Sequence, residues 1–234
     1  MRRTVVIPAY DEERRLPPSL PRALAWAGPD GEVIVVDDGS TDATAEIAAQ
    51  AGARVIRSPA NRGKGHAVRE GIAAARGEVI VVTDADLASP IEEADHLIAA
   101  LEAGAEIAIG VRRRVGRNQP WHRLVLGRVY GGFVRKVLAI EVRDPQCGLK
   151  AFRRSTAQAL SRRCQLDSYS FDAEILALAI RQGVPVAQVA VRWTDVPGTK
   201  VRVFHDGARM VMDVLGLGLR QRALQVLPGL PARE

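Results

Sequence analysis

Short apolar runs alternate with longer, alanine-rich stretches through the first half of the chain. The runs are rich in β-branched residues and have the length of strands, whereas the stretches between them have the length of helices. We predict strands at residues 5–7, 33–36, 54–56, 79–82 and 107–109. We predict helices at residues 42–51, 65–75 and 91–103. The first strand is expected to stop at Pro8, which has no backbone N–H to donate.

Continuous apolar strands that alternate with helices predict an α/β fold, with a mostly parallel central sheet flanked by helices. Ligands of such sheets bind at the carboxyl ends of the strands. Two acidic pairs fall there: Asp37 and Asp38 end the second strand, and Asp84 and Asp86 follow the fourth. The shared location favours a binding site at this edge of the sheet.

The second half of the chain has a less regular pattern. It predicts a basic amphipathic helix at residues 118–140, a strand at 149–152, a helix at 171–181 and a strand at 186–193. Residues 204 to about 224 are predicted to be helical, with apolar residues and arginines mixed along the helix. Such a helix suits a membrane interface, and it equally suits packing on the domain or on a second subunit of a homodimer.

Length and composition indicate one globular domain over residues 1–225, with a flexible tail at 226–234. No apolar run reaches the roughly 18 residues that span a bilayer. The N-terminus leads directly into a strand, without the apolar segment of a signal peptide. With Cys147 and Cys164 as the only cysteines, we expect a cytoplasmic protein with free thiols that pack as small core residues.

The net charge of +6 suits nucleic acid, an anionic membrane surface or a phosphorylated substrate. Nucleic acid is the weakest of these, because aromatic residues make up only 4% of the chain and stacking platforms are therefore scarce. We expect no nucleic-acid partner, and we expect peripheral contact with the inner face of the cell membrane.

Asp84-Ala85-Asp86 suits a hard divalent cation, because Mg²⁺ is usually held by one or two carboxylates together with substrate phosphates. Alone, this short and common pattern is more often an ordinary pair of turn aspartates. Asp37 and Asp38 repel each other without a partner, which the base or ribose of a nucleotide would provide. Lys64, in a glycine-flanked loop, either meets a phosphate or belongs to a plain loop.

Four motifs in this order resemble the nucleotide-sugar-binding half of glycosyltransferase family 2. They are VIPAYDE at residues 6–12, VVDDGSTD at 35–42, NRGKG at 61–65 and DAD at 84–86. Later motifs are similar to those of its dolichyl-phosphate glucosyltransferase branch. They are DPQCGLKAF at 144–152, FDAE at 171–174 and WTDVPGTKV at 193–201.

The resemblance implies a GT-A-type fold, with a nucleotide-binding half at about residues 1–112 and an acceptor-side half at about 113–225. It implies inverting, metal-dependent transfer of a hexose, in the first place glucose from UDP-glucose, to polyprenyl or dolichyl monophosphate, with Mg²⁺ or Mn²⁺ as cofactor. The alternatives are another donor, such as GDP-mannose or UDP-N-acetylhexosamine, a soluble acceptor, or a non-catalytic nucleotide-sugar-binding subunit.

The same resemblance assigns roles residue by residue. The catalytic residues are Asp84, Asp86 and Arg112, of which Asp84 and Asp86 hold the metal. The nucleotide-sugar is bound by Pro8, Tyr10, Glu12, Asp37, Asp38, Lys64, Asp84, Ala85 and Asp86. The acceptor phosphate is bound by Arg112, with Arg123 or Arg128 as the second cation. The sugar or the loop around it is contacted by Gln146, Asp172, Glu174 and Lys200.

Two departures from the family pattern stand out. The family usually has Asn where Asp11 stands, which we expect to change a loop contact rather than the chemistry. Eukaryotic relatives of this branch carry an N-terminal membrane helix, and the sequence here shows none, so that membrane attachment through such a helix is not expected.

Overall fold

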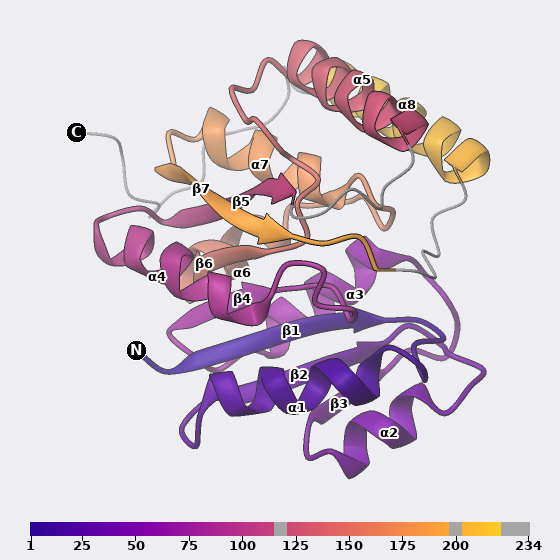
Figure 1. Cartoon of the computed structure of the whole chain (residues 1–234). Coiled ribbons are helices and arrows are strands. Elements are labelled where there is room, and N and C mark those ends of the chain that lie inside the picture. The colour runs from indigo at the N-terminus through magenta and orange to yellow at the C-terminus, as the bar shows by residue number, and fades with distance from the viewer. Residues whose placement is uncertain (115–120, 197–202, 221–234) are drawn as a thin grey trace.

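The computed structural model describes residues 1–114, 121–196 and 203–220. Its centre is a seven-stranded sheet in the order β3-β2-β1-β4-β6-β5-β7 (Figure 1). The strands are β1 (Arg3–Ala9), β2 (Glu32–Asp37), β3 (Arg54–Arg57), β4 (Val79–Val82), β5 (Ile107–Arg114), β6 (Lys150–Arg153) and β7 (Val186–Trp193). Only β6 runs against its neighbours, so the mostly parallel sheet is confirmed.

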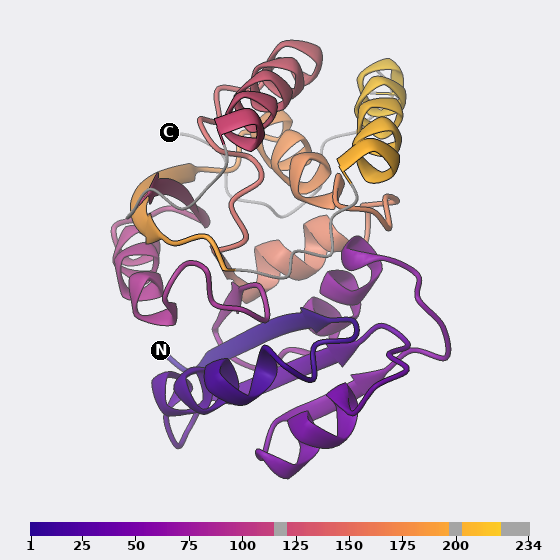
Figure 2. The same cartoon turned by 45° about the vertical axis from the view of Figure 1, so that its right-hand side comes forward.

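Helices cover both faces of this sheet (Figure 2). They are α1 (Leu16–Ala27), α2 (Thr44–Gln50), α3 (Lys64–Ala74), α4 (Ala94–Glu102), α5 (Trp121–Leu138), α6 (Arg154–Ser161), α7 (Phe171–Arg181) and α8 (Val203–Arg220), with a 3-10 turn, η1, at Ile91–Glu93. Of these, α1 and α6 lie outside the set predicted from the sequence.

Two hydrophobic cores result from the alternation of side chains along the strands. In β1, Val6 points into a core with α3, α6 and α7, whereas Val5 and Ile7 point into a second core with α1, α2 and α4. Because both faces are buried, the central strands read as continuous apolar runs rather than alternating ones. The carboxyl ends of the parallel strands β1, β2 and β4 lie at the same edge of this sheet.

The first strand continues through Pro8, contrary to our prediction. Pro8 pairs in register with Val36 of β2. The carbonyl of Ala9 accepts from Asp38 on the β2 side, and the carbonyl of Val6 accepts from Thr83 on the β4 side. Alternate residues face opposite neighbours, so the nitrogen of Pro8 faces the side where the β4 pairing has already ended, and no ladder hydrogen bond is lost.

Helices α5 and α8 lie side by side above the sheet (Figures 1 and 2). Gly218 allows their close approach, since a Cβ atom there would lie 2.8 Å from a methyl group of Val137. Val214 and Leu217 of α8 are buried, so this helix packs on the domain, as one of our alternatives had it. None of the described helices is long and apolar enough to cross a membrane.

Candidate active site

A cavity of about 1290 Å³ opens where the parallel strands end. It is larger than the usual pocket for one small molecule, so it has room for two substrates side by side. Most of the residues singled out in the sequence line it, namely Pro8, Tyr10, Glu12, Asp38, Lys64, Asp84, Ala85, Asp86, Arg112, Arg128, Gln146 and Asp172. Residues far apart in the chain therefore meet in one place.

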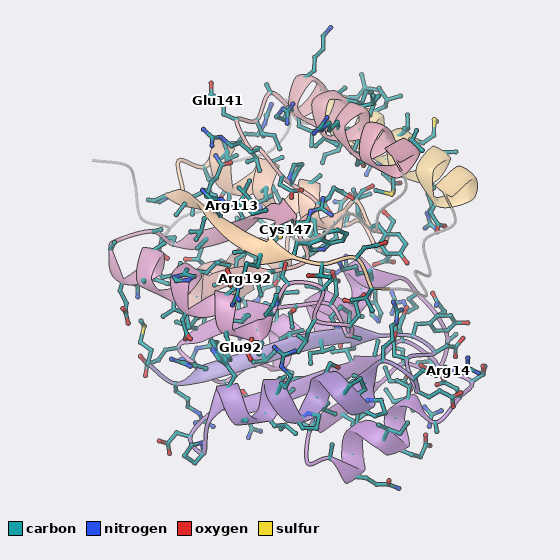
Figure 3. All side chains as sticks on the ribbon, viewed as in Figure 1. Arg14, Glu92, Arg113, Glu141, Cys147 and Arg192 are labelled. Carbon is teal, nitrogen blue, oxygen red and sulfur yellow. The ribbon has the colours of Figure 1, made fainter. Side chains whose placement is uncertain are left out.

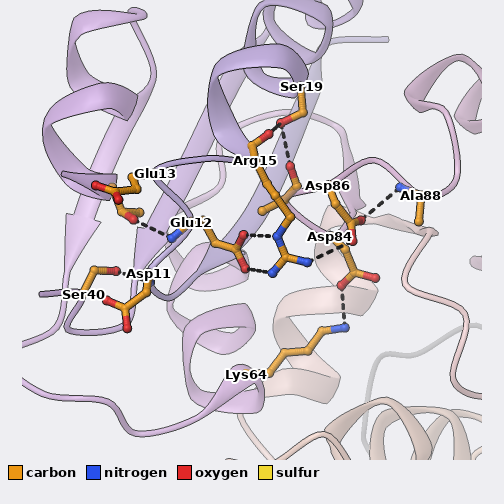
Figure 4. A network of polar contacts seen from close by, with 12 residues as sticks. Asp11, Glu12, Glu13, Arg15, Ser19, Ser40, Lys64, Asp84, Asp86 and Ala88 are labelled. Atoms are coloured by element: carbon orange, nitrogen blue, oxygen red, sulfur yellow. Dashed lines mark hydrogen bonds and ion pairs between the residues drawn. The ribbon is translucent and has the colours of Figure 1, made fainter. Parts of the chain in front are cut away.

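Asp84 and Asp86 follow β4 directly, and each is paired with a cation (Figure 4). The Lys64 Nζ atom donates to Asp84 Oδ1 at 2.7 Å. Arg15 lies 3.4 Å from Asp86 Oδ2 and also pairs with Glu12, while the backbone N–H of Ala88 donates to Asp86 Oδ1 at 3.0 Å. The turn after β4 is thus held by Arg15, from the loop between β1 and α1, and by Lys64 at the start of α3.

The environment moves the pKa values of the two carboxyl groups in opposite directions. Burial and the charge of Asp84 raise the pKa of Asp86 above its ordinary value. Burial would also raise the pKa of Asp84, but the Lys64 ammonium outweighs it and lowers that pKa. Lys64 behaves in the complementary way: burial opposes its charge, yet Asp84 and Asp172 raise its pKa.

Asp84 and Asp86 fit a divalent cation whose remaining ligands come from a substrate. Within the described residues, no group of three or more His, Cys, Asp or Glu side chains is arranged to hold a metal ion. Asp84 and Asp86 both face the cavity, however, and the Asp84 side chain is 43% exposed to it. Two carboxylates completed by phosphate oxygens are the usual environment of Mg²⁺.

Asp38 organises the loop that carries Lys64. Its carboxylate accepts from the backbone N–H groups of Arg62 at 3.1 Å and of Gly63 at 2.7 Å. Burial raises the pKa of Asp38 in spite of these two donors. Asp37 lies behind it, fully buried, where it accepts from Ser40 and pairs with Arg57. The structure therefore places Asp38 at the cavity and Asp37 in its supporting layer.

Arg112, at the cavity end of β5, is fixed on two sides. Its guanidinium makes a double hydrogen bond to Asp144, with distances of 2.6 and 2.8 Å. The Trp193 ring lies against the guanidinium, with the Arg112 Cζ atom 5.6 Å from the ring centroid. A guanidinium held in this way is oriented before any ligand arrives, which favours recognition of a planar or phosphate group.

The loop between Asp144 and Lys150 connects Arg112 with the carboxylates. Gly148 lies against the Asp84 carboxylate, so closely that a side chain at this position would overlap it. Lys150 begins β6 and is 1% exposed, and its Nζ atom contacts the Cys147 carbonyl and the Asp172 carboxylate. This loop therefore carries both Asp144, the partner of Arg112, and Gly148, the neighbour of Asp84.

Glu174 is not among the residues that line the cavity. Glu174 points away from the cavity and accepts the backbone N–H groups of Gln165 and Leu166, which makes it a support for the loop before α7. The side chain of Arg123 and all of Lys200 lie outside the described residues. Our assignment of Glu174 was to the sugar or the Gln146 loop, whereas in the structure its carboxylate supports the loop before α7.

Arg15 and Lys150 were missed in the sequence. Arg15 stands three residues after Glu12, a spacing at which the two side chains of a helical turn can meet. Lys150 is the one charged residue in the predicted strand at 149–152. A lysine in an otherwise apolar strand signals a buried cation that needs a carboxylate partner, here Asp172.

Asp11, where the family usually has Asn, makes the contacts that an Asn would make. Its Oδ1 atom accepts the backbone N–H of Thr41 at 2.9 Å, a contact that the carbonyl oxygen of Asn makes equally well. The residue has a positive φ of 49°, a conformation that Asn and Asp tolerate better than most residues. The contact joins the turn after β1 to the turn after β2.

Both cysteines are free and buried, as expected for core residues. Figure 3 shows Cys147 near the middle of the molecule, and its side chain is 0% exposed. Burial raises the pKa of the Cys147 thiol to about 11, so that it stays protonated at neutral pH. A protonated, enclosed thiol is a poor nucleophile, which leaves the carboxylates and cations as the chemistry of the cavity.

The profile of Glycosyl transferase family 2 matches residues 4–160, more than half of the chain. The chain belongs to this family. The resemblance stated from the motifs is thereby confirmed, and the protein is a glycosyltransferase.

Curated relatives cover nearly the whole chain. A Drosophila melanogaster protein named dolichyl-phosphate beta-glucosyltransferase is 37% identical over 93% of this chain and 74% of its own length. A Homo sapiens protein of the same name is 34% identical over 93% of this chain and 75% of its own length. The later motifs at residues 144–152 and 193–201 thus belong to a similarity that extends through both halves.

Solved structures show the same fold. Glucosyl-3-phosphoglycerate synthase from Mycobacterium tuberculosis, in a complex with Mn²⁺, UDP-glucose and phosphoglyceric acid, superposes with a TM-score of 0.70. The two proteins are 23% identical, and the match covers 95% of this chain and 80% of the other. The predicted GT-A-type fold is confirmed.

Proposed function

We propose that this glycosyltransferase moves a hexose, with UDP-glucose as the first candidate donor, onto polyprenyl or dolichyl monophosphate, with inversion at the anomeric carbon. The observation that carries the proposal is that Asp84, Asp86 and Lys64 line one cavity together with Arg112 and Arg128. The first group suits a metal-bound diphosphate and the second an acceptor phosphate. The names of the relatives contain the same transferred sugar, glucose, and the same acceptor, dolichyl phosphate.

The reaction is a single displacement. An oxygen of the acceptor phosphate forms a bond to the anomeric carbon, and the bond to the diphosphate oxygen breaks, with its electron pair leaving on the nucleoside diphosphate. A phosphate monoester is already ionised near pH 7, since its second pKa is about 6, and it needs no general base. The main requirement for catalysis is therefore that the residues of the cavity stabilise the negative charge on the departing diphosphate.

Different residues of the cavity contribute to this stabilisation and to the positioning of the acceptor. Asp84 and Asp86 would hold Mg²⁺ or Mn²⁺, which supplies Lewis-acid stabilisation of the leaving diphosphate. Lys64 adds a second positive charge on the same side. Asp38 holds the loop of Lys64 in place through Gly63. Arg112, oriented by Asp144, directs the acceptor phosphate toward the sugar.

A donor panel tests the proposed function. The purified protein is given a detergent-solubilised polyprenyl phosphate, Mn²⁺ or Mg²⁺, and UDP-glucose, GDP-mannose or UDP-N-acetylglucosamine in turn, with lipid products read by mass spectrometry. We expect a hexosyl phospholipid from UDP-glucose alone, and none in excess EDTA. Metal-dependent donor hydrolysis without lipid product would indicate a soluble acceptor. Tight donor binding with neither product would favour the non-catalytic subunit.

An apolar surface beside the cavity supports peripheral membrane contact. Among the described residues, six large hydrophobic side chains are well exposed, and five of them lie on α5 and α8. They are Leu126, Val129, Met212, Leu215 and Leu219. Exposed cations on the same helices suit anionic lipid headgroups, namely Arg128, Arg135, Lys136, Arg209 and Arg220. Because Arg128 and Arg209 also line the cavity, a lipid phosphate would enter from this side.

Flotation on vesicles tests this surface. We expect the protein to float with phosphatidylglycerol vesicles at low salt and to bind at least about five-fold more weakly in 0.5 M NaCl, where charges are screened. Met212→Glu together with Leu219→Glu, both on exposed positions, should abolish flotation while the melting temperature stays unchanged. Equal recovery of the variant and the parent protein would contradict the assignment of α8 to the bilayer.

A further inference from the structure

Four charged groups form a row that reaches from the interior of the domain to the cavity. Lys150 Nζ lies 3.0 Å from Asp172 Oδ1, Lys64 Nζ lies 3.7 Å from Asp172 Oδ2, and Lys64 Nζ lies 2.7 Å from Asp84 Oδ1. The exposed fractions of Lys150, Asp172, Lys64 and Asp84 are 1%, 7%, 18% and 43% in this order. The row is electrically neutral, with charges that alternate in sign.

The fold supplies these groups from four elements. Lys150 is the first residue of β6, in register with Val82 of β4, two residues before Asp84. Asp172 stands in the first turn of α7, and Lys64 is the first residue of α3. A buried lysine is costly unless it is paired, and the charge of Lys150 is paired with the carboxylate of Asp172. Its role is therefore to be sought through Asp172.

A divalent cation held by Asp84 would compete with Lys64 for the same carboxylate. A cation that binds Asp84 brings positive charge within a few ångströms of the Lys64 ammonium, and the two repel each other. Asp172 already lies on the other side of Lys64 and offers its Oδ2 atom. The second oxygen of Asp172 is held by Lys150, which fixes the carboxylate in the interior.

We propose that Asp172 and Lys150 are positioning residues for the metal and diphosphate site: Asp172 receives Lys64 when a divalent cation takes Asp84, and Lys150 holds Asp172 ready for it. This inference rests on the proposed function, because it takes Asp84 as a metal ligand. It explains why a buried lysine lies behind an active-site carboxylate. It also keeps the positive charge of Lys64 at the cavity, where the residue could contact a bound diphosphate.

Binding of Mn²⁺ to the full chain without donor, measured from the loss of the free-ion electron paramagnetic resonance signal, tests the exchange. Lys64→Met removes the competitor, so we expect Mn²⁺ to bind about ten-fold more tightly than to the parent protein. Lys64→Arg keeps the charge and should stay within two-fold of the parent. Arg62→Met is the matched control, because it removes one positive charge from the same loop and leaves the Asp84 contact in place.

Asp172→Asn tests the receiving carboxylate. In the parent protein this change should weaken Mn²⁺ binding three- to ten-fold, since Lys64 has no second partner and Lys150 loses its own. In the Lys64→Met background only the contribution through Lys150 remains. The logarithm of the factor by which Asp172→Asn weakens Mn²⁺ binding should therefore be at most half of its value in the parent protein. A merely structural role of Asp172 would give the same penalty in both backgrounds, which would overturn the proposal.

The remaining outcomes are also decisive. A Lys64→Met protein that binds Mn²⁺ no better than Arg62→Met overturns the exchange, and so does a lack of Mn²⁺ binding by both the parent and Lys64→Met proteins. Tighter Mn²⁺ binding by Lys64→Met, together with a parent protein that yields no product from any donor, would uphold the exchange and refute the proposed reaction. The two claims therefore fail separately.

Discussion

Replacement of Asp86 by alanine is expected to lower turnover at least about 10³-fold, at any concentration of Mg²⁺ or Mn²⁺. A loss of this size corresponds to about 4 kcal/mol of transition-state stabilisation. The physical reason is that Asp86 and Asp84 are the two carboxylates that face the cavity after β4, and one carboxylate alone is a weak ligand for a hard cation beside a diphosphate. Initial rates of product formation over a metal titration give the result.

Two measurements separate this loss from a folding defect. Asp95→Ala makes the same chemical change on α4, where the side chain is half exposed and pairs with Arg3, and it should retain activity within about two-fold. The melting temperature of Asp86→Ala should stay within a few degrees of the parent, because Arg15 keeps its partner Glu12. Near-normal activity of Asp86→Ala would overturn the metal assignment.

The sheet was predictable because its strands are buried on both faces and therefore read as unbroken apolar runs. Helix α1 escaped prediction because Pro17, Pro18 and Pro21 lie within it. Two of them occupy its first turn, where no N–H donor is needed, and all three are exposed. The buried residues Leu16, Leu20, Ala23 and Ala27 have the spacing of one helix face. The hydrophobic pattern of a helix was therefore present in the sequence in spite of the prolines.

The aspartates of the candidate site could be predicted from the sequence, whereas the residues that hold the site in place could not. Asp38, Asp84 and Asp86 follow strands directly, and the carboxyl ends of parallel strands meet at one edge whatever the loops do. Lys150 meets Asp172 only because β6 is inserted antiparallel between β4 and β5, a pairing that no local pattern encodes. Side chains that depend on long-range strand order are beyond reach of spacing arguments.

Gly148→Ala is expected to reduce turnover at least about 10²-fold while the protein stays folded. A Cβ atom on Gly148 would overlap the carboxylate of Asp84, and the backbone of the loop cannot retreat easily because Lys150 holds the neighbouring Cys147 carbonyl. The mobile partner is the Asp84 side chain, which is 43% exposed and would turn into the cavity. A carboxylate displaced by about an ångström no longer shares a cation with Asp86, and misplacement of this order costs about 10²-fold in rate.

The matched control is Gly216→Ala on α8, where a Cβ atom meets nothing within 4 Å. This change should leave turnover intact and stabilise the helix, since alanine is favoured over glycine in a helix by about 1 kcal/mol. Affinity for UDP with Mn²⁺, measured by calorimetry, should fall for Gly148→Ala and stay constant for Gly216→Ala. If Gly148→Ala bound UDP with Mn²⁺ as tightly as the parent and turned over normally, the contact between residue 148 and Asp84 would have no part in the metal site.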